Sequence, residues 1–269
     1  MKLNQFLITL FCGAILFSNS FMTQAKSTIK GEEIIYQTNG INCKGYVAFD
    51  EAKKGKRPAI IVVHEWWGCG DYVRHRADML AELGYIAIAV DLFGEGKFAD
   101  NPEQAKEYAM PFYQNPELAR AGIEAAVEKI KSYPQADAKN IAAIGYCFGG
   151  SMVLNVAKMG MDFKGVVSFH GGLSGGVPAT KGTTKAQILV CNGAADKFVS
   201  ADDIKSFQQN LDEMKVSYIF KSYESALHAF TNPIATENGI KFNMPIAYNE
   251  AADKQSWIDM KDFLSKIFK

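Results

Sequence analysis

The sequence predicts an α/β protein in which a mostly parallel sheet is covered by helices on both faces and preceded by an antiparallel hairpin. Apolar runs with strand character alternate with helical stretches along the chain, which is typical of parallel sheets. Several of these runs are continuously apolar, as expected for strands buried on both faces. Asn39-Gly40 separates the first two β-prone runs and is the strongest short signal for a hairpin. No linker or repeat interrupts the chain, so residues 26–269 are expected to form a single domain.

The elements are expected in the following order. After the hairpin in "EEIIYQTNGINCKGYVAF", the predicted strands are "PAIIVVHEWWG", "YIAIAVDLFGEG", "NIAAIGY", "GVVSFHGG", "QILVCNGAAD" and "VSYIFKSY". Helices are expected in "YVRHRADMLAELGY" with an end near Gly84, over about 101–131 with breaks at Pro111 and Pro116, from about Phe148, in "DDIKSFQQNLDEM", and from about Glu250.

The N-terminus has the features of a secretory signal peptide. Lys2 is followed by the apolar stretch "FLITLFCGAILF" and then by small and polar residues up to "TQA". The apolar stretch is too short for a resident membrane-spanning helix. We therefore expect residues 1–25 to be removed after Ala25, and the mature protein to be periplasmic or secreted. N-terminal sequencing of the native protein would check this expectation.

The charge balance excludes several kinds of partner. The chain has 29 basic and 29 acidic side chains. Removal of residues 1–25 takes away Lys2 and no acidic residue, which leaves 28 against 29 and a net charge of −1. Without a basic field, neither nucleic acid nor stable association with a membrane is expected after cleavage. The sequence leaves the oligomeric state open between a monomer and a small homo-oligomer.

Cysteine usage argues against a disulfide scaffold. The mature chain keeps Cys43, Cys69, Cys147 and Cys191, and it has no Cys-x-x-Cys motif of the dithiol redox kind. A single bridge among Cys43, Cys69 and Cys191 remains open at this point.

Reactive side chains gather where the predicted strands end. In parallel sheets, ligands bind outside the carboxyl ends of the strands. The residues at those ends are His64-Glu65-Trp66-Trp67-Gly68, Asp91, Cys147, His170, Asp196 and His228. Cys147, Asp196 and His228 follow one another as nucleophile, acid and base, which is the chain order of α/β-hydrolases.

Cys147 lies in "GYCFGG", between an apolar strand and a helix. Side chains at Gly145 or Gly149 would collide across a sharp strand-to-helix turn. The N-terminus of the following helix favours a thiolate over a thiol, which suits a nucleophile. Asp196 would hold the imidazole of His228 in the tautomer that a general base needs. The alternative for Cys147 is a buried structural cysteine.

The other two positions have alternatives as well. Asp196 could be a turn or helix-cap aspartate, although Asp202 and Asp203 are better placed for capping. His228 could be a surface loop residue.

The "HEWWG" loop resembles part of a metal-binding motif. It begins like the His-Glu-x-x-His zinc signature, but Gly68 stands where the second histidine should be, so neither a metal nor a cofactor is expected. In hydrolases with the chain order nucleophile, acid, base, such a loop supplies one backbone N–H of the oxyanion hole, here that of Trp66. The other donor would be Phe148, which follows the nucleophile.

The remaining residues of these loops are expected to form the walls of a substrate pocket. The candidates are His64, Trp67, His170, Lys97 and Asn232, together with Glu65. The two tryptophans serve either to exclude water or simply as core aromatics.

These segments together resemble the dienelactone hydrolase family, a cysteine branch of the α/β-hydrolases. "HEWWG", "YIAIAVDLFGEGK", "GYCFGG", "SFHGG", "NGAADKFV" and "LHAFTNP" occur in the family's order over nearly the whole mature chain. The resemblance implies the α/β-hydrolase fold and hydrolysis of a small ester or lactone through a thioester on Cys147. It also implies that Glu65 is the resting-state partner of the thiol and holds it quiescent until substrate arrives.

One position departs from the family pattern. Enzymes that define the family bind the substrate carboxylate with arginines, one of them four residues past the catalytic histidine; here that position is Asn232. After Asp91 the chain offers Lys97 but no arginine before Arg120. An amide does not replace a guanidinium fork, so dienelactone itself is not the expected substrate.

Two alternatives to a hydrolase remain open at the level of sequence. One is a thiol-based redox or peroxide-reducing protein that uses Cys147, for which Cys69 would be the resolving cysteine in a site loop. The other is a non-catalytic binding protein on a hydrolase scaffold, which would be expected to have lost part of its triad.

Overall fold

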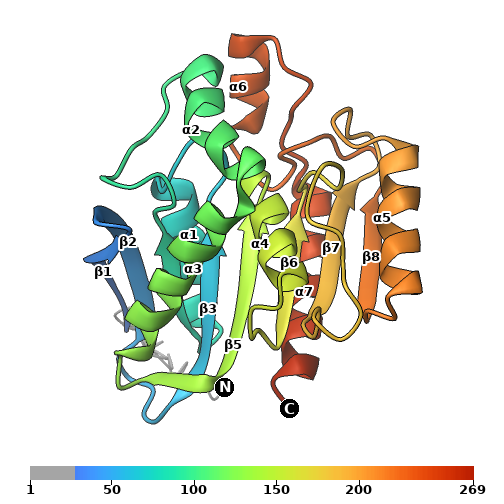
Figure 1. The fold of residues 1–269 in the computed structure, drawn as a ribbon. Helices are drawn as coiled ribbons and strands as arrows, with labels where there is room; N and C mark the ends of the chain where they lie inside the picture. The colour runs from blue at the N-terminus through green and yellow to red at the C-terminus, as the bar shows by residue number, and fades with distance from the viewer. Residues whose placement is uncertain (1–27) are drawn as a thin grey trace, which may run out of the picture.

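The computed structural model describes residues 28–269, whose centre is a single eight-stranded sheet (Figure 1). The strands are β1 (Ile29–Thr38), β2 (Ile41–Asp50), β3 (Arg57–Val63), β4 (Ile86–Val90), β5 (Ala136–Tyr146), β6 (Gly165–Phe169), β7 (Gln187–Gly193) and β8 (Tyr218–Tyr223). Their spatial order is β1-β2-β4-β3-β5-β6-β7-β8. The β1–β2 and β2–β4 pairs are antiparallel, whereas all pairs from β4 to β8 are parallel. The predicted fold class is therefore confirmed, and the carboxyl ends of six strands share one edge.

The hairpin between β1 and β2 turns at the predicted dipeptide. Asn39 and Gly40 both have positive φ, 49° and 78°. Two successive residues in this region form a type I′ turn, whose twist matches that of the flanking strands.

The helices divide between the two faces of the sheet. They are α1 (Asp71–Glu82), α2 (Pro102–Gln114), α3 (Pro116–Lys131), α4 (Phe148–Lys158), α5 (Ala201–Glu213), α6 (Ala235–Phe242) and α7 (Glu250–Ile267). Helices α3, α4 and α5 pack on one face, and α1 and α7 on the other (Figure 1). The strand β3 serves both cores, because Ile61 and Val63 point into the first and Ile60 and Val62 into the second.

Two helices stand apart from these layers. Figure 1 shows α2 and α6 beyond the carboxyl ends of the parallel strands, above the edge where the candidate residues gather. The predicted break of α2 at Pro111 is wrong. The helix continues to Gln114, and the N–H of Asn115 donates to the Pro111 carbonyl at 2.9 Å. A proline so near a helix end removes one hydrogen bond and leaves the last turn intact. Helix α6 lies in a segment for which no element was predicted.

The predicted signal peptide lies outside the described residues. Over residues 28–269, no helix combines the length and the apolar character needed to cross a membrane.

Candidate active site

Cys147 occupies the sharp turn between β5 and α4. Its backbone has φ 51° and ψ −113°, a conformation that costs a non-glycine residue about 1–3 kcal/mol and persists only where the surroundings enforce it. A Cβ on Gly145 would lie 2.1 Å from the Gly149 carbonyl oxygen, so the turn closes only with glycine there. The structure thus confirms the prediction that a side chain at Gly145 would collide across the turn.

Gly149 brings a second loop to the same place. A Cβ on Gly149 would lie 2.3 Å from the Val63 carbonyl oxygen, and its N–H donates to the His64 carbonyl at 3.0 Å. The loop that carries Trp66 is therefore held against the first turn of α4. Phe148 begins that helix, where backbone N–H groups have no acceptor within the helix.

The structure brings Cys147, His228 and Asp196 together from three separate strand ends. The Nε2 atom of His228 lies 3.0 Å from the Sγ atom of Cys147, and its Nδ1 atom lies 2.8 Å from Oδ2 of Asp196. The other carboxylate oxygen of Asp196 accepts the N–H of Phe198 at 2.8 Å, which fixes the orientation of the carboxylate. A nucleophile, a base and an acid that orients the base are thus in hydrogen-bonding contact.

The electrostatics favour a charged imidazole. Burial lowers the pKa of His228, but the neighbouring Cys147 and the hydrogen bond to Asp196 outweigh burial and raise this pKa to about 10. The Asp196 side chain is fully buried and the His228 side chain only 12% exposed, so water screens their attraction weakly.

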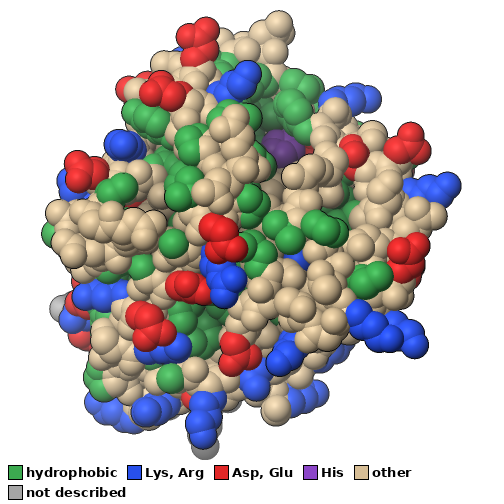
Figure 2. Space-filling view, in the orientation of Figure 1, with side chains coloured by type: hydrophobic (Ala, Val, Ile, Leu, Met, Phe, Trp, Pro, Cys, Tyr) green, Lys and Arg blue, Asp and Glu red, His purple; other side chains and the backbone are tan. Residues whose placement is uncertain are grey.

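A cavity of about 290 Å³ opens beside Cys147. Its walls are Glu65, Trp66, Trp67, Tyr113, Cys147, Gly172, Ser174, Phe198, His228, Ala229, Met244 and Ile246. Figure 2 shows a histidine side chain among apolar side chains on the upper part of this face. The walls contain no lysine and no arginine, so they suit an uncharged ligand.

Several of these wall residues were missed from the sequence. Tyr113 comes from α2 and packs edge-on against Phe148, with ring centroids 5.6 Å apart. Phe198 follows β7 and packs edge-on against His228 at 5.0 Å. Met244 and Ile246 come from the segment after α6. Phe198 lies in the loop of Asp196, whereas only the packing of α2 and α6 reveals Tyr113, Met244 and Ile246.

Glu65 lies in the cavity wall but is bonded elsewhere. Its Oε2 atom accepts the amide Nδ2–H of Asn232 at 2.5 Å, while the Cys147 thiol contacts His228. Burial raises the pKa of Glu65 to about 7, although the Asn232 hydrogen bond and the charges of His228 and Arg76 lower it. Near neutral pH, the carboxyl group is therefore poised between its two protonation states.

Trp67 and Glu65 also face a neighbouring cavity of about 330 Å³. Asn232 lies in the wall of that second cavity and not in the wall of the Cys147 cavity. Trp67 lines both cavities, so its indole lies between them. The indole packs against Phe242 of α6, with ring centroids 5.8 Å apart.

The two strand-end histidines are not pocket residues, contrary to expectation. His64 and His170 are completely buried. The Nδ1 atom of His64 contacts the Glu65 carbonyl at 2.5 Å, and its Nε2 accepts the N–H of Leu92 at 3.3 Å. This histidine therefore ties two loops together, since both ring nitrogens are occupied by backbone groups.

The prediction that Lys97 lines the substrate pocket is also wrong. It lies at a different cavity of about 340 Å³, with Nζ 5.8 Å from the ring centroid of Tyr108. The cause is Asp91, whose carboxylate accepts N–H groups of Lys44, Gly94 and Gly96 at 2.8 to 2.9 Å. These bonds fold the loop after β4 toward the β1–β2 hairpin and away from Cys147.

All four cysteines of the described residues are free thiols. Burial raises the pKa of Cys43 to about 11 and that of Cys69 and Cys191 to about 12. None of these three lines the Cys147 cavity, so no resolving cysteine faces the candidate nucleophile. Within residues 28–269, no group of three or more His, Cys, Asp or Glu side chains is arranged to hold a metal ion.

The family model and a curated relative point to the same family of proteins. The sequence model of the dienelactone hydrolase family matches residues 43–268. A protein of Aquifex aeolicus named "Putative carboxymethylenebutenolidase" is 27% identical over 208 residues, which cover 75% of this chain and 87% of the relative.

Solved structures agree with the sequence relatives. A dienelactone hydrolase-like promiscuous phosphotriesterase from metagenomic libraries is 30% identical with a TM-score of 0.84, covering 90% of this chain and 100% of that chain. A "putative dienelactone hydrolase" of Klebsiella pneumoniae shares the fold with a TM-score of 0.73 at 22% identity, covering 88% of this chain and 98% of that one.

Proposed function

The chain belongs to the dienelactone hydrolase family and is a hydrolase of the ester or lactone type, and we propose that it works through a Cys147-His228-Asp196 triad. One observation carries the proposal. The thiol, the imidazole and the carboxylate are linked by contacts of 3.0 and 2.8 Å, with the thiol at the wall of a cavity. This is the arrangement that acyl transfer to an activated nucleophile requires.

The proposed reaction has two halves. The Cys147 proton passes to Nε2 of His228, the resulting thiolate attacks the ester carbonyl beside the imidazolium, and a tetrahedral oxyanion forms. The C–O bond then breaks, the imidazolium returns the proton to the leaving alcohol, and a thioester remains on Cys147. Water attacks the thioester with His228 as general base, the C–S bond breaks, and the carboxylic acid leaves with the thiol restored.

Two backbone N–H groups are proposed to bind the oxyanion. Phe148 supplies one at the start of α4, and Trp66 supplies the other from the loop that Gly149 allows to approach. Each such donor typically contributes about 100- to 1000-fold to the rate.

An uncharged ester or lactone is the substrate class that the cavity supports. No lysine or arginine lines the Cys147 cavity, and Lys97 and Asn232 lie at neighbouring cavities. A substrate carboxylate would lose its hydration there without gaining a cationic partner. The solved relative is by name a promiscuous phosphotriesterase, and phosphotriesters are also uncharged.

A substrate panel tests this function. We expect purified protein to hydrolyse p-nitrophenyl butyrate with a kcat/KM at least about tenfold above that for mono-p-nitrophenyl succinate, which has similar length and one added carboxylate. Small neutral lactones, thioesters and a neutral phosphotriester complete the panel. Equal rates for the two esters would contradict the substrate class. Absence of turnover throughout the panel, together with thiol-dependent peroxide reduction, would favour the redox alternative.

The gating role of Glu65 is part of the proposal. An ionised carboxylate in the cavity wall disfavours a thiolate at Cys147 by repulsion between like charges. In the described structure, Asn232 holds Glu65 while the thiol faces His228, which is the arrangement required for attack. We propose that the resting enzyme exchanges this arrangement for one in which the thiol donates to Glu65.

Glu65→Gln should stabilise the fold above neutral pH. The pKa of Glu65 is raised from 4.5 to about 7 in the folded chain, so the protonated form is the one that the fold favours. The contribution is complete below about pH 4.5 and is lost as pH rises to about 7, which amounts to about 3 kcal/mol. Glutamine mimics the protonated form, so denaturant unfolding at about pH 8 should show the variant more stable than wild type, and at about pH 4.5 equally stable.

A second measurement on this variant addresses gating. Iodoacetamide should alkylate Cys147 faster, and at lower pH, in Glu65→Gln than in wild type, because the competing negative charge is gone. Glu213→Gln, an exposed position at the end of α5, is the matched control and should behave as wild type in both measurements. Identical alkylation profiles for wild type and Glu65→Gln would mean that Glu65 does not gate the thiol.

A further inference from the structure

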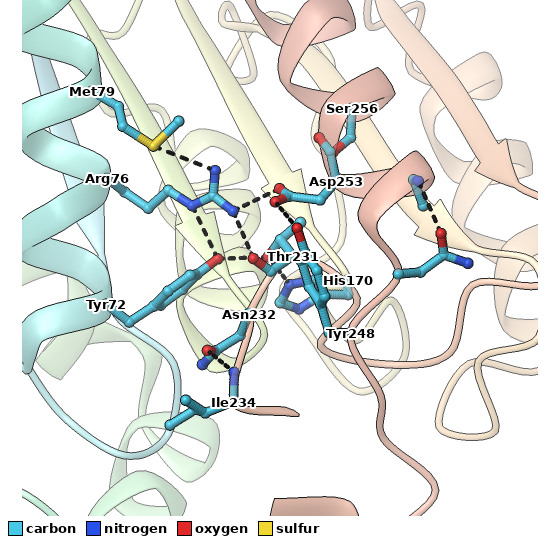
Figure 3. Close-up of polar contacts among 12 residues, drawn as sticks. Tyr72, Arg76, Met79, His170, Thr231, Asn232, Ile234, Tyr248, Asp253 and Ser256 are labelled. Atoms are coloured by element: carbon cyan, nitrogen blue, oxygen red, sulfur yellow. Dashed lines mark hydrogen bonds and ion pairs between the residues drawn. The ribbon is translucent and has the colours of Figure 1, made fainter. Parts of the chain in front are cut away.

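A chain of hydrogen bonds runs from the backbone of Cys147 into the interior of the protein, and Figure 3 shows its part from His170 to Arg76. The N–H of Cys147 lies 3.0 Å from Nδ1 of His170 and 2.9 Å from the carbonyl of Phe169, so the two acceptors share it. The Nε2 atom of His170 lies 2.7 Å from Oγ1 of Thr231, and this hydroxyl lies 2.6 Å from the hydroxyl of Tyr72. His170 and Thr231 are both completely buried.

Arg76 anchors the far end of the chain. It donates from Nε to the Tyr72 hydroxyl at 3.3 Å, and from one terminal nitrogen to the Thr231 carbonyl and to Asp253, each at 2.6 Å. Figure 3 shows these groups converging from α1, α7 and the loop between β8 and α6. The rings of Tyr72, Tyr146 and Trp257 surround the guanidinium at 5.3 to 5.6 Å. Helix α1 therefore holds Thr231 through both its carbonyl and its hydroxyl, and Asp253 of α7 holds Arg76 in place.

The geometry fixes the protonation state of His170. A backbone N–H can only donate, so Nδ1 must be the unprotonated acceptor and Nε2 must carry the hydrogen that goes to Thr231. Burial holds the pKa of His170 well below its usual value, and the nearby positive charges of His228 and Arg76 lower it further. His170 stays neutral and cannot take a proton from the Cys147 thiol, since its free lone pair points at the amide.

Thr231 lies three residues after His228 in the same loop, so His170 connects the turn of the nucleophile with the loop of the base. The two imidazole rings also pack edge to face, with centroids 5.3 Å apart. We propose that His170 and Thr231 are positioning residues that set the distance between Cys147 Sγ and His228 Nε2. This inference rests on the proposed function, because that distance matters only if the thiol and the imidazole react together.

The test compares two substitutions at Thr231 with one elsewhere. Thr231→Val keeps the shape and removes the hydroxyl, and Thr231→Ser keeps the hydroxyl. Thr184→Val removes a different buried hydroxyl, which donates to the Lys158 carbonyl at 3.3 Å away from the cavity. We expect Thr231→Val to lower kcat by about tenfold with KM changed less than about twofold, while Thr231→Ser and Thr184→Val stay near wild type.

Alkylation of Cys147 by iodoacetamide, from about pH 5 to about pH 10, gives a readout that needs no substrate. Thr231→Val should lower the rate near neutral pH by about tenfold and change the pH profile, and Thr231→Ser should restore both. If Thr184→Val lowers kcat and alkylation as much, the effect is general destabilisation and the proposal is wrong. A Thr231→Val protein with the wild-type profile would also overturn it. If the wild-type protein did not hydrolyse esters at all, the proposed function would be refuted. The alkylation rates of Cys147 would still show whether the His170–Thr231 hydrogen bond affects the thiol.

Discussion

Cys147→Ala should lower kcat for ester hydrolysis by about 1000-fold or more, the largest effect expected of any substitution in the cavity wall. Alanine removes the atom that would accept the acyl group, and His228 and Asp196 then have no proton to transfer from it. The fold should survive, because Cys147 is held by its backbone: its N–H contacts His170 and Phe169, and its carbonyl accepts the N–H of Ser151. Steady-state hydrolysis of p-nitrophenyl butyrate measures the loss, and mass spectrometry of wild-type protein quenched during turnover should show the acyl adduct on Cys147.

Cys69→Ala is the matched control for this variant. Cys69 is a buried free thiol that does not line the Cys147 cavity, so its removal should leave kcat unchanged. In a redox mechanism, both cysteines would be needed. Undiminished ester hydrolysis by Cys147→Ala would refute the thioester mechanism, and equal losses in the two variants would favour the redox alternative.

The fold could be predicted because its signals are local. Continuous apolar runs mark strands buried on both faces, and Asn39-Gly40 supplies the two positive φ values that a tight hairpin needs. Helix α6 was not predicted, because it is only eight residues long and follows Pro233. Neither its length nor its periodicity distinguishes it from a loop. Its C-terminal cap, Asn243 at φ 50°, was a local signal that could have been used.

The order of functional residues along the chain predicted Cys147, Asp196 and His228, because in this topology each strand end delivers its residue to the same edge. The same rule failed for His64 and His170. Position at a strand end fixes where the backbone lies but not which way the side chain points, and both rings turn inward to bond backbone groups.

The cavity walls depended on contacts between distant segments. Tyr113 reaches Cys147 only because α2 crosses above the sheet, and Lys97 is drawn away because Asp91 bonds the hairpin. Asn232 stands where the resemblance implies an arginine, and its contact with Glu65 follows only from the folded structure.

Asp196→Asn should lower kcat by roughly 1000- to 10,000-fold through the tautomer of His228. In the wild type, Oδ1 of Asp196 accepts the N–H of Phe198 while Oδ2 accepts the hydrogen of His228 Nδ1. In the asparagine variant, the Phe198 N–H still requires an oxygen, so the amide NH₂ must face His228 and donate to Nδ1. The imidazole hydrogen then moves to Nε2 and points at the Cys147 sulfur, and the base can no longer accept the thiol proton.

The loss of the negative charge at Asp196 acts in the same direction, because Asp196 helps to raise the pKa of His228 to about 10. NMR titration should therefore show the His228 imidazolium losing its proton at lower pH in the variant than in the wild type.

Asp203→Asn separates this effect from a simple loss of charge in the same region. Asp203 lies seven residues later and caps α5 by accepting the N–H of Ser200 at 2.9 Å, a bond that asparagine can also accept. We expect this variant to lose at most about 1 kcal/mol of stability and to keep the wild-type kcat and the wild-type titration of His228. If Asp196→Asn retained more than about a tenth of the wild-type kcat, Asp196 would be a structural turn residue and the base would not depend on it. If Asp203→Asn lost as much activity as Asp196→Asn, the cause would lie in the electrostatic field of the region, since of these two aspartates it is Asp196 that contacts the imidazole.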